Sequence, residues 1–207
     1  MSPRTRFLAT FITGAVLVFS GLSGCATVDQ KISLNYAPTD RSFGNHNGEI
    51  VVSRLDPPSA VQNSRGEWII GSLNNVHGVH RADLLSDRSL GEWISDALVL
   101  ELKHAGYTVT SAPALPGDVS RGALITDINV HLDVNKGLVS DQIKHELKFN
   151  VGVFLNGAKV KTFTVVSHDN STLFTAAKED KEKIMLKSLQ DAMQQIVPDI
   201  IALIEKK

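Results

Sequence analysis

The dipeptide Asn156-Gly157 constrains the fold of this chain most strongly, because it lies between two long runs in which apolar and polar residues alternate. Asn-Gly tolerates the positive φ angles of a two-residue type I′ turn, which connects two antiparallel strands. Such a turn pairs Leu155 with Ala158 and sets the register of both strands. Counting outward predicts the pairs Val153–Val160, Val151–Thr162, Phe149–Thr164 and Leu147–Val166.

This register places three apolar side chains of the hairpin on an otherwise polar face. Phe154, Phe163 and Val165 are expected beside lysine, asparagine and glutamate side chains. An apolar cluster on a solvated face is typical of a docking site, so these residues are a candidate partner surface. The alternative is that the N-terminal segment around Leu34 and Tyr36 folds across the cluster and covers it.

The run 123–135 is a second strongly patterned strand. Its expected buried residues share one parity and are Leu124, Ile128, Val130, Leu132 and Val134. Asp127, His131 and Asp133 are expected on the solvated face, where alternate side chains lie about 6.6 Å apart. His131 and Asp133 could touch a common ion, but a solvated face whose charges pair with lysines on the next strand is the favoured interpretation.

Two segments carry the apolar spacing of helices. Ser89 is predicted to cap the first helix, which a glycine ends. The second helix is predicted over 178–204, with a kink or break at Pro198. Together with shorter strands at 49–55 and 107–110, these elements predict an α+β fold. It is a two-layer sandwich, a mainly antiparallel sheet with two helices packed on one face.

The stretch 71–87 is interpreted as a loop that carries His77 and His80. Asp83 and His46 are the candidate further ligands if these histidines bind a metal. Zinc takes about three or four ligands in a tetrahedral array, and the spacing provides no fixed third ligand. A surface loop with incidental histidines is therefore favoured, and no metal site is predicted.

The N-terminus has the parts of a secretory signal. Two arginines precede the uncharged run 7–19, which is shorter than the roughly 20 apolar residues of a membrane span. An uncleaved anchor helix is the alternative. Leu22, Ser23 and Gly24 then precede Cys25, and this tetrapeptide resembles a bacterial lipobox. The resemblance implies that signal peptidase recognises the first three residues and that the cysteine thiol accepts a diacylglyceryl group.

Lipidation of Cys25 has consequences for location. Cleavage before Cys25 frees its α-amine for a further acyl chain, and three acyl chains hold a protein firmly on a membrane. In many Gram-negative lipoproteins an aspartate after this cysteine retains the protein at the inner membrane. Here the residue is Ala26, which favours the outer membrane with the domain facing the periplasm. The covalent diacylglycerol and N-acyl lipid are the only bound groups expected.

The chain divides into three parts. Residues 1–24 are the predicted signal peptide, 25–48 the lipidated N-terminus and tether, and 49–207 a single periplasmic α+β domain. The tether is polar and irregular, although Ile32 and Leu34 alternate with polar residues and can add one short strand.

Charge and motifs exclude several function classes. Removing residues 1–24 removes two arginines and no acid, so the formal net charge changes from −1 to about −3, which does not suit nucleic acid. The chain after Cys25 lacks the motifs of serine nucleophiles, HExxH zinc sites and phosphate loops. We therefore expect no enzyme. The remaining catalytic alternative is a metal-dependent hydrolase that uses His77 and His80.

Several segments together resemble the YajG-like family of uncharacterised bacterial lipoproteins. They are the box LSGC, the strand EIVVSRL, the helix EWISDALVLELKHAGY, the strand ALITDINVHLDV, the Asn-Gly hairpin and the terminal helix. The resemblance implies a periplasmic α+β domain on an outer-membrane anchor and supplies no catalytic residues. The expected function is a non-catalytic binding or accessory module of an envelope complex. Its partners are the membrane, through the anchor, and another envelope protein. The alternative is a lipid- or glycan-handling auxiliary lipoprotein of a transport system.

Overall fold

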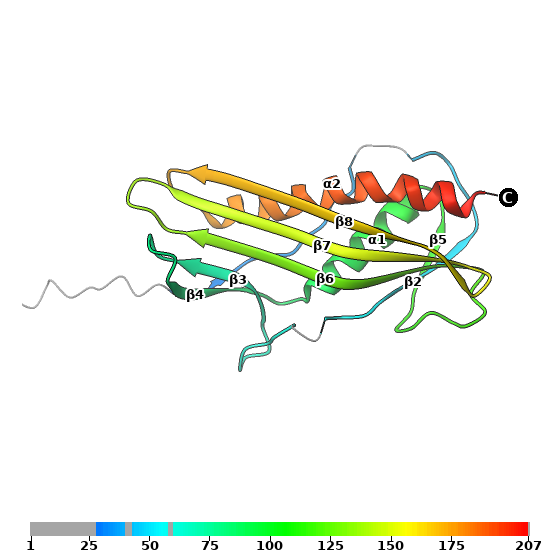
Figure 1. Ribbon diagram of the computed structural model, residues 1–207, viewed down its shortest axis with the longest axis horizontal. Helices are drawn as coiled ribbons and strands as arrows, with labels where there is room; N and C mark the ends of the chain where they lie inside the picture. The colour runs from blue at the N-terminus through cyan, green and yellow to red at the C-terminus, as the bar shows by residue number, and fades with distance from the viewer. Residues whose placement is uncertain (1–27, 40–42, 58–59, 207) are drawn as a thin grey trace, which may run out of the picture.

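The computed structural model describes residues 28–39, 43–57 and 60–206. Its strands are β1 (Gln30–Lys31), β2 (Glu49–Arg54), β3 (Trp68–Asn74), β4 (His80–Ser86), β5 (Thr108–Ser111), β6 (Arg121–Asn135), β7 (Asp141–Leu155) and β8 (Ala158–Leu173). Its helices are α1 (Leu90–His104) and α2 (Lys178–Ile204). The strands form one mixed sheet, and both helices cover the same face of it (Figure 1). The predicted α+β class is confirmed.

The long antiparallel strands β6, β7 and β8 make up one side of the sheet (Figure 1). Every second residue of β7 from Ile143 to Val153 is buried, because α2 packs on this face. The stripe of α2 that covers the sheet recurs every three to four residues and includes Met185, Leu189, Met193, Ile196 and Ile200. The helix continues past Pro198 without a break.

The β7–β8 hairpin begins in the predicted register and then departs from it. Leu155 pairs with Ala158 across the turn, but a β-bulge follows, and Val153 pairs with Lys161 instead of Val160. The later pairs shift in the same way: Val151–Phe163, Phe149–Val165 and Leu147–Ser167. Because side chains alternate between faces, one extra residue exchanges the two faces of β8. The predicted register is therefore wrong beyond the bulge.

A second irregularity changes the parity of β6. Asp127 has a φ of 52°, and the ladder to β7 shifts between Thr126 and Asn129. Ile125 and Ile128 are consequently both buried, although they are three residues apart. Leu124 lies on the other face and is only half-buried, so its predicted place in the core is wrong.

The stretch predicted as the loop 71–87 is instead largely a hairpin. β3 and β4 pair antiparallel from Trp68 with Ser86 to Asn74 with His80. The connecting turn is closed by Asn75, whose side-chain oxygen accepts hydrogen bonds from two backbone amides of the turn, each at 2.9 Å. Turn chemistry thus explains the asparagine and glycine content that suggested a loop.

The first part of the predicted tether is packed against the domain. Ile32 and Leu34 are fully buried, and β1 pairs in parallel with β4. The following residues lie along both helices, since Trp93 of α1 donates to the carbonyl of Asn35 at 3.2 Å and Gln190 of α2 donates to that of Ala37 at 2.8 Å. The alternation of Ile32 and Leu34 thus marks a part of the predicted tether that packs on the domain, because its apolar side chains complete the core.

Candidate functional site

The sheet changes partners along one edge of β6, and the candidate site lies at this change. The first part of β6 pairs in parallel with β2, up to Ile125. The last part pairs in parallel with β3, from Asp133 onward. The positive φ of Asp127 and the bulge beside it lie between these two pairings. The interruption leaves space between β2 and β3 that a continuous ladder would fill.

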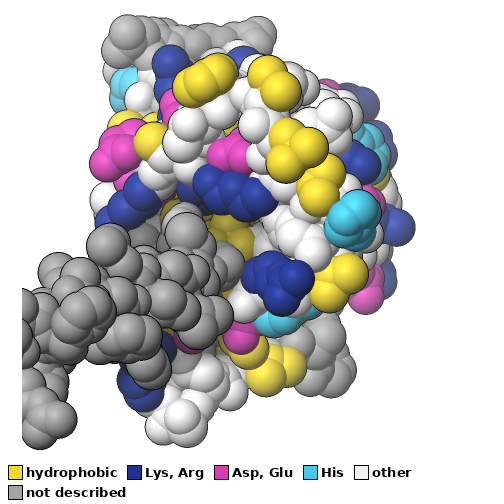
Figure 2. Space-filling model, turned by 90° about the vertical axis from the view of Figure 1, so that its left-hand side faces the viewer, with side chains coloured by type: hydrophobic (Ala, Val, Ile, Leu, Met, Phe, Trp, Pro, Cys, Tyr) yellow, Lys and Arg dark blue, Asp and Glu magenta, His cyan; other side chains and the backbone are white. Residues whose placement is uncertain are grey.

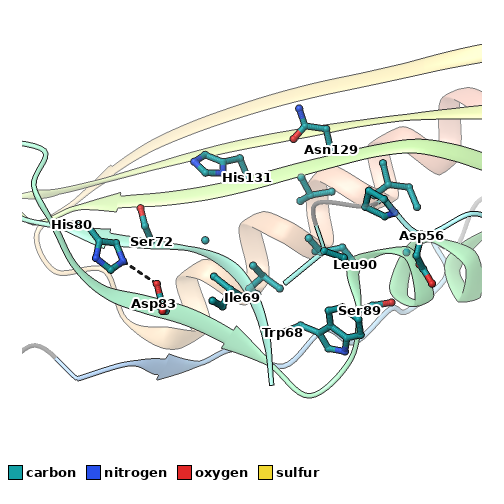
Figure 3. A pocket seen from close by; sticks show the side chains of 17 residues that line it. Asp56, Trp68, Ile69, Ser72, His80, Asp83, Ser89, Leu90, Asn129 and His131 are labelled. Carbon is teal, nitrogen blue, oxygen red and sulfur yellow. Dashed lines mark hydrogen bonds and ion pairs between the residues drawn. The ribbon is translucent and has the colours of Figure 1, made fainter. Parts of the chain in front are cut away.

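A half-open pocket of about 350 Å³ occupies this space (Figure 3). Its apolar lining comes mainly from β3, β6 and the start of α1 and includes Trp68, Ile69, Ile70, Leu90, Ile128 and Val130. Polar groups lie toward its two ends, with Ser72, His80 and Asp83 at one end and Asp56 and Ser89 at the other (Figure 3). An apolar lining with a few polar groups and this volume suits a small molecule or part of a larger one.

The N-terminus of α1 forms one wall of the pocket. Ser89 caps the helix as predicted, because its hydroxyl accepts a hydrogen bond from the amide of Glu92 at 3.0 Å. The carboxylate of Asp56 lies close to this helix end, since a Cβ added at Gly91 would be 2.1 Å from one of its oxygens. Asp56 accepts a hydrogen bond from Arg54 at 3.2 Å. An acid of the chain itself therefore occupies the electropositive helix end, which disfavours an anionic ligand.

Among the described residues of the polar rim, no nucleophile lies beside a general base. His131 lies 3.1 Å from Asp133, and the hydroxyl of Ser72 donates to the same carboxylate. A serine nucleophile needs a general base such as a histidine at its hydroxyl. In this arrangement the carboxylate lies between the serine and the histidine, so the order of groups differs from that of a hydrolytic triad.

The four candidate metal ligands are not brought together. His80 is 2.8 Å from Asp83 on β4, while His77 lies in the exposed β3–β4 turn. His46 stacks on Tyr107 near the other end of α1, with ring centroids 5.5 Å apart. Over residues 28–39, 43–57 and 60–206, no group of three or more His, Cys, Asp or Glu is arranged to hold a metal.

A second, smaller hollow lies on the solvated face of β6, β7 and β8. It measures about 220 Å³, and cross-strand pairing aligns His131, Glu146 and His168 along it. The predicted solvated face of β6 is thereby confirmed for His131, which is exposed. Alternation alone could not show which residues of β7 and β8 lie opposite it, because that depends on register.

His145 is a residue that the sequence analysis missed. It lies on the buried face of β7, and neither of its ring nitrogens has a hydrogen-bond partner among the described residues. Burial lowers the pKa of His145 to about 4, although the nearby carboxylate of Asp169 acts in the opposite direction. His145 is odd-numbered like the apolar residues of β7, and this alternation is the signal that could have placed it on the buried face.

The predicted partner surface is not assembled as expected. Val165 is 2% exposed and Phe163 packs against the core, because the bulge turns both toward α2. Their predicted place on the polar face is wrong. Phe154 lies before the bulge and is half-buried on the opposite face, so it alone stays a candidate for contact with a partner.

The predicted lipidation site lies outside the described residues. This holds for Cys25 and for the recognition residues Leu22, Ser23 and Gly24. Neither of the described helices is long and apolar enough to cross a membrane.

No protein-family model matches the sequence, and a search of curated proteins returns no match. Several solved structures align with most of this chain at TM-scores below 0.5. A Xanthomonas campestris protein of family DUF330 is 13% identical, with a TM-score of 0.49 over 85% of this chain and 95% of that one. A Helicobacter pylori homologue of a neuraminyllactose-binding hemagglutinin is 11% identical, with a TM-score of 0.44 over 84% and 98%. An Acinetobacter baumannii minor lipoprotein is 14% identical, with a TM-score of 0.40 over 64% and 90%. Similarities this low do not assign the chain to any of these families, and the resemblance to the YajG-like family stays a prediction.

Proposed function

We propose that this chain is a lipid-anchored protein of the bacterial envelope that binds another envelope component and has no catalytic activity of its own. The observation that carries the proposal is the tetrapeptide ending at Cys25, placed directly after a basic and then apolar N-terminal segment. The domain that follows offers a ligand-sized pocket and an exposed sheet face, and its rim lacks a serine–histidine contact among the hydrogen bonds of the described residues.

The anchor is tested by replacing Cys25 with alanine and separating membrane from soluble fractions of the native host. We expect the wild-type protein in the membrane fraction and Cys25→Ala in the soluble fraction or as unprocessed precursor. Mass spectrometry of the N-terminal peptide should find the diacylglyceryl and N-acyl groups. An unmodified cysteine in the wild-type protein, or unchanged membrane association of the variant, would show that the anchor assignment is wrong.

The outer-membrane location rests on Ala26 and has its own matched variant. Ala26→Asp keeps the lipidation site and introduces the residue that retains many lipoproteins at the inner membrane. We expect this variant to move from the outer-membrane to the inner-membrane fraction on a density gradient. Equal distribution of both forms would contradict outer-membrane sorting through this residue.

The pocket beside Asp127 favours a second candidate function, the handling of a lipid or glycan group for a transport system. Its apolar lining and polar ends can hold one sugar ring or a short apolar group. Native mass spectrometry of protein purified from its host should then show a carried molecule. Trp68 lines the pocket and is one of two tryptophans, so Trp93→Phe leaves it as a single fluorescent reporter of ligand binding. A ligand-free mass and an emission unchanged by candidate ligands would contradict this second function.

A further inference from the structure

Three loops meet at one end of the sheet, which we term the loop end. They are residues 75–79 between β3 and β4, 136–140 between β6 and β7, and 174–177 between β8 and α2. The strand ladders place them together, because the last residues of β3 and β6 are paired, and so are the first residue of β7 and the last of β8.

The loop end exposes large apolar side chains at its tips. Leu138 is 93% exposed, Phe174 is 85% exposed and Val139 is 75% exposed, while Val76 and Val79 are each more than half exposed. Figure 2 looks onto this end and shows separate hydrophobic patches with Lys, Arg and His side chains among them, and also Asp or Glu side chains. None of the three loops contains an acidic residue. Isolated exposed apolar residues are ordinary, but this many at one end of a domain indicate a contact surface.

Hydrogen bonds hold two of these loops in place behind their tips. The carboxylate of Asp141 accepts from Lys136 at 2.7 Å and from the amide of Ala176 at 2.8 Å, which joins the loops 136–140 and 174–177. The buried ammonium of Lys181 donates to the carbonyl of Ala176 at 2.8 Å. The apolar tips are therefore presented outward by a fixed framework.

The N-terminal chain reaches the domain from the same end. β4 starts at the loop end, and β1 runs parallel to β4, so the residues before β1 lie toward this end. Asp29 is fixed beside the middle of β4, because its side chain accepts a hydrogen bond from the amide of Asp83 at 3.0 Å. Cys25 precedes Asp29 by four residues, and four residues of fully extended chain span at most about 14 Å.

We propose that the loop end lies against the lipid bilayer and that Leu138, Val139 and Phe174 insert into its interface. The proposal rests on the lipid anchor proposed above, because acyl chains on Cys25 would hold this end within a short distance of the membrane. Exposed apolar side chains at the loop tips suit insertion into the interface of a bilayer. Of the acidic residues that border the loops, Asp141 is paired with Lys136 and Asp180 accepts a hydrogen bond from the amide of Ala177. The domain then contacts the membrane directly and turns its opposite end toward the periplasm.

The test uses the anchored, full-length protein and the single cysteine of the chain. Lipidation consumes the thiol of Cys25, so a second cysteine becomes the only thiol that a fluorophore can label. Leu138→Cys and Phe174→Cys carry an environment-sensitive probe at the loop end. Ala158→Cys is the matched control, because it is exposed at the opposite end of the β7–β8 hairpin. The labelled proteins are reconstituted into vesicles of phosphatidylethanolamine and phosphatidylglycerol.

We expect blue-shifted emission and quenching by nitroxide-labelled lipids at positions 138 and 174 and neither effect at position 158. Equal, water-like emission at all three positions in anchored protein would overturn the contact while leaving the anchor intact. The membrane contact would also be overturned if the probes at positions 138 and 174 were shielded in cell envelopes but water-exposed in vesicles that contain no other protein. A protein partner would then cover this end. Loss of the protein from the vesicles altogether would instead reject the anchor.

A second measurement compares substitutions in the unanchored protein. The Cys25→Ala protein should bind the same vesicles only weakly, too weakly to keep it in the membrane fraction of cells. In this background Leu138→Asp and Phe174→Asp should each lower that residual binding about tenfold, because each removes one inserted apolar side chain. Val160→Asp is the matched control, since Val160 is exposed on β8 away from the loop end. An equal effect of all three substitutions would contradict insertion at the loop end.

Discussion

The two ends of the long β7 strand are built on different principles. At the Asn156-Gly157 end, the turn packs against the chain before β6, since the amides of both turn residues donate to the carbonyls of Ser120 and Val119 at 2.9 and 2.7 Å. At the loop end, the corresponding tip carries Leu138 almost fully exposed. Backbone geometry explains the residues of the first turn, whereas nothing in the fold requires an apolar residue at the second. The contrast separates residues kept for folding from residues available for contact.

The largest expected loss of stability is at the buried middle of β7, and a substitution at the loop end provides the comparison. Phe149→Ala should lower the free energy of unfolding by about 3–5 kcal/mol, because it removes a fully buried aromatic ring. Leu138→Ala should change it by less than about 0.5 kcal/mol. Urea denaturation of the two variants measures both values. A large loss for Leu138→Ala would show that the loop-end residue serves the fold after all.

Two glycines sharpen the comparison between the ends. Gly157 and Gly78 both have positive φ, but only at Gly157 would an added Cβ meet a backbone oxygen, that of Gly117 at 2.3 Å. Gly157→Ala should therefore cost about 2–3 kcal/mol and Gly78→Ala about 1 kcal/mol, the latter from backbone conformation alone. Thermal denaturation checks the order. Equal costs would mean that the turn at Gly157 can move away from its neighbour.

Acid should destabilise the domain through His145. The unfolded chain binds a proton at the ordinary histidine pKa of 6.5, whereas the folded pKa is about 4, so the unfolded state binds more protons between these values. Stability present above pH 6.5 is then lost as the pH falls, by about 1.4 kcal/mol at pH 5.5 relative to pH 7.5.

The matched variant for this pH effect is His145→Phe, which should show a smaller loss between pH 7.5 and 5.5. Denaturation curves at both pH values measure the difference. His77 lies exposed in the β3–β4 turn, and His77→Phe should leave the pH dependence of the wild-type protein unchanged. A pH dependence that persists in His145→Phe would assign it to other groups.

The smallest expected effect concerns the helix termini beside the pocket and the loop end. Ser89→Ala removes the side-chain cap of α1 and should cost about 1 kcal/mol. The N-cap of α2 is Ala177, which has no side-chain oxygen to accept a backbone hydrogen bond. Ala177→Ser should therefore leave stability unchanged or raise it by a few tenths of a kcal/mol. Calorimetry of both variants measures whether the unfolding temperature falls or rises. A lower stability of Ala177→Ser would contradict the expected difference between the two helix termini.

Local sequence patterns correctly predicted the elements that a cap, an apolar stripe or a turn dipeptide defines. The helices were placed from Ser89 and from the apolar stripe that ends near Ile204, and the structure confirms both. The Asn156-Gly157 turn was predicted with its first strand pair. These features depend on interactions between residues close in sequence, so a single chain segment contains the information.

The failures share a different cause. The bulge on β8 adds one residue to the ladder, and it moved Phe163 and Val165 from the predicted surface into the core. The bulge at Asp127 acted in the opposite direction on Leu124, which lies half-buried on the other face instead of in the predicted core. A bulge is stabilised by packing across the sheet, so alternation within one strand does not reveal it.

The sequence by itself determined the fold class, the two helices and the Asn-Gly turn, because each depends on patterns within single chain segments, and it predicts the lipid anchor at Cys25 in the same way. Only the tertiary structure decided the register beyond the bulges, the pocket beside Asp127 and the gathering of Leu138, Val139 and Phe174 at one end. Each of these brings together segments far apart in the chain. The pairing of distant strands, which places them, depends on the packing of the whole domain.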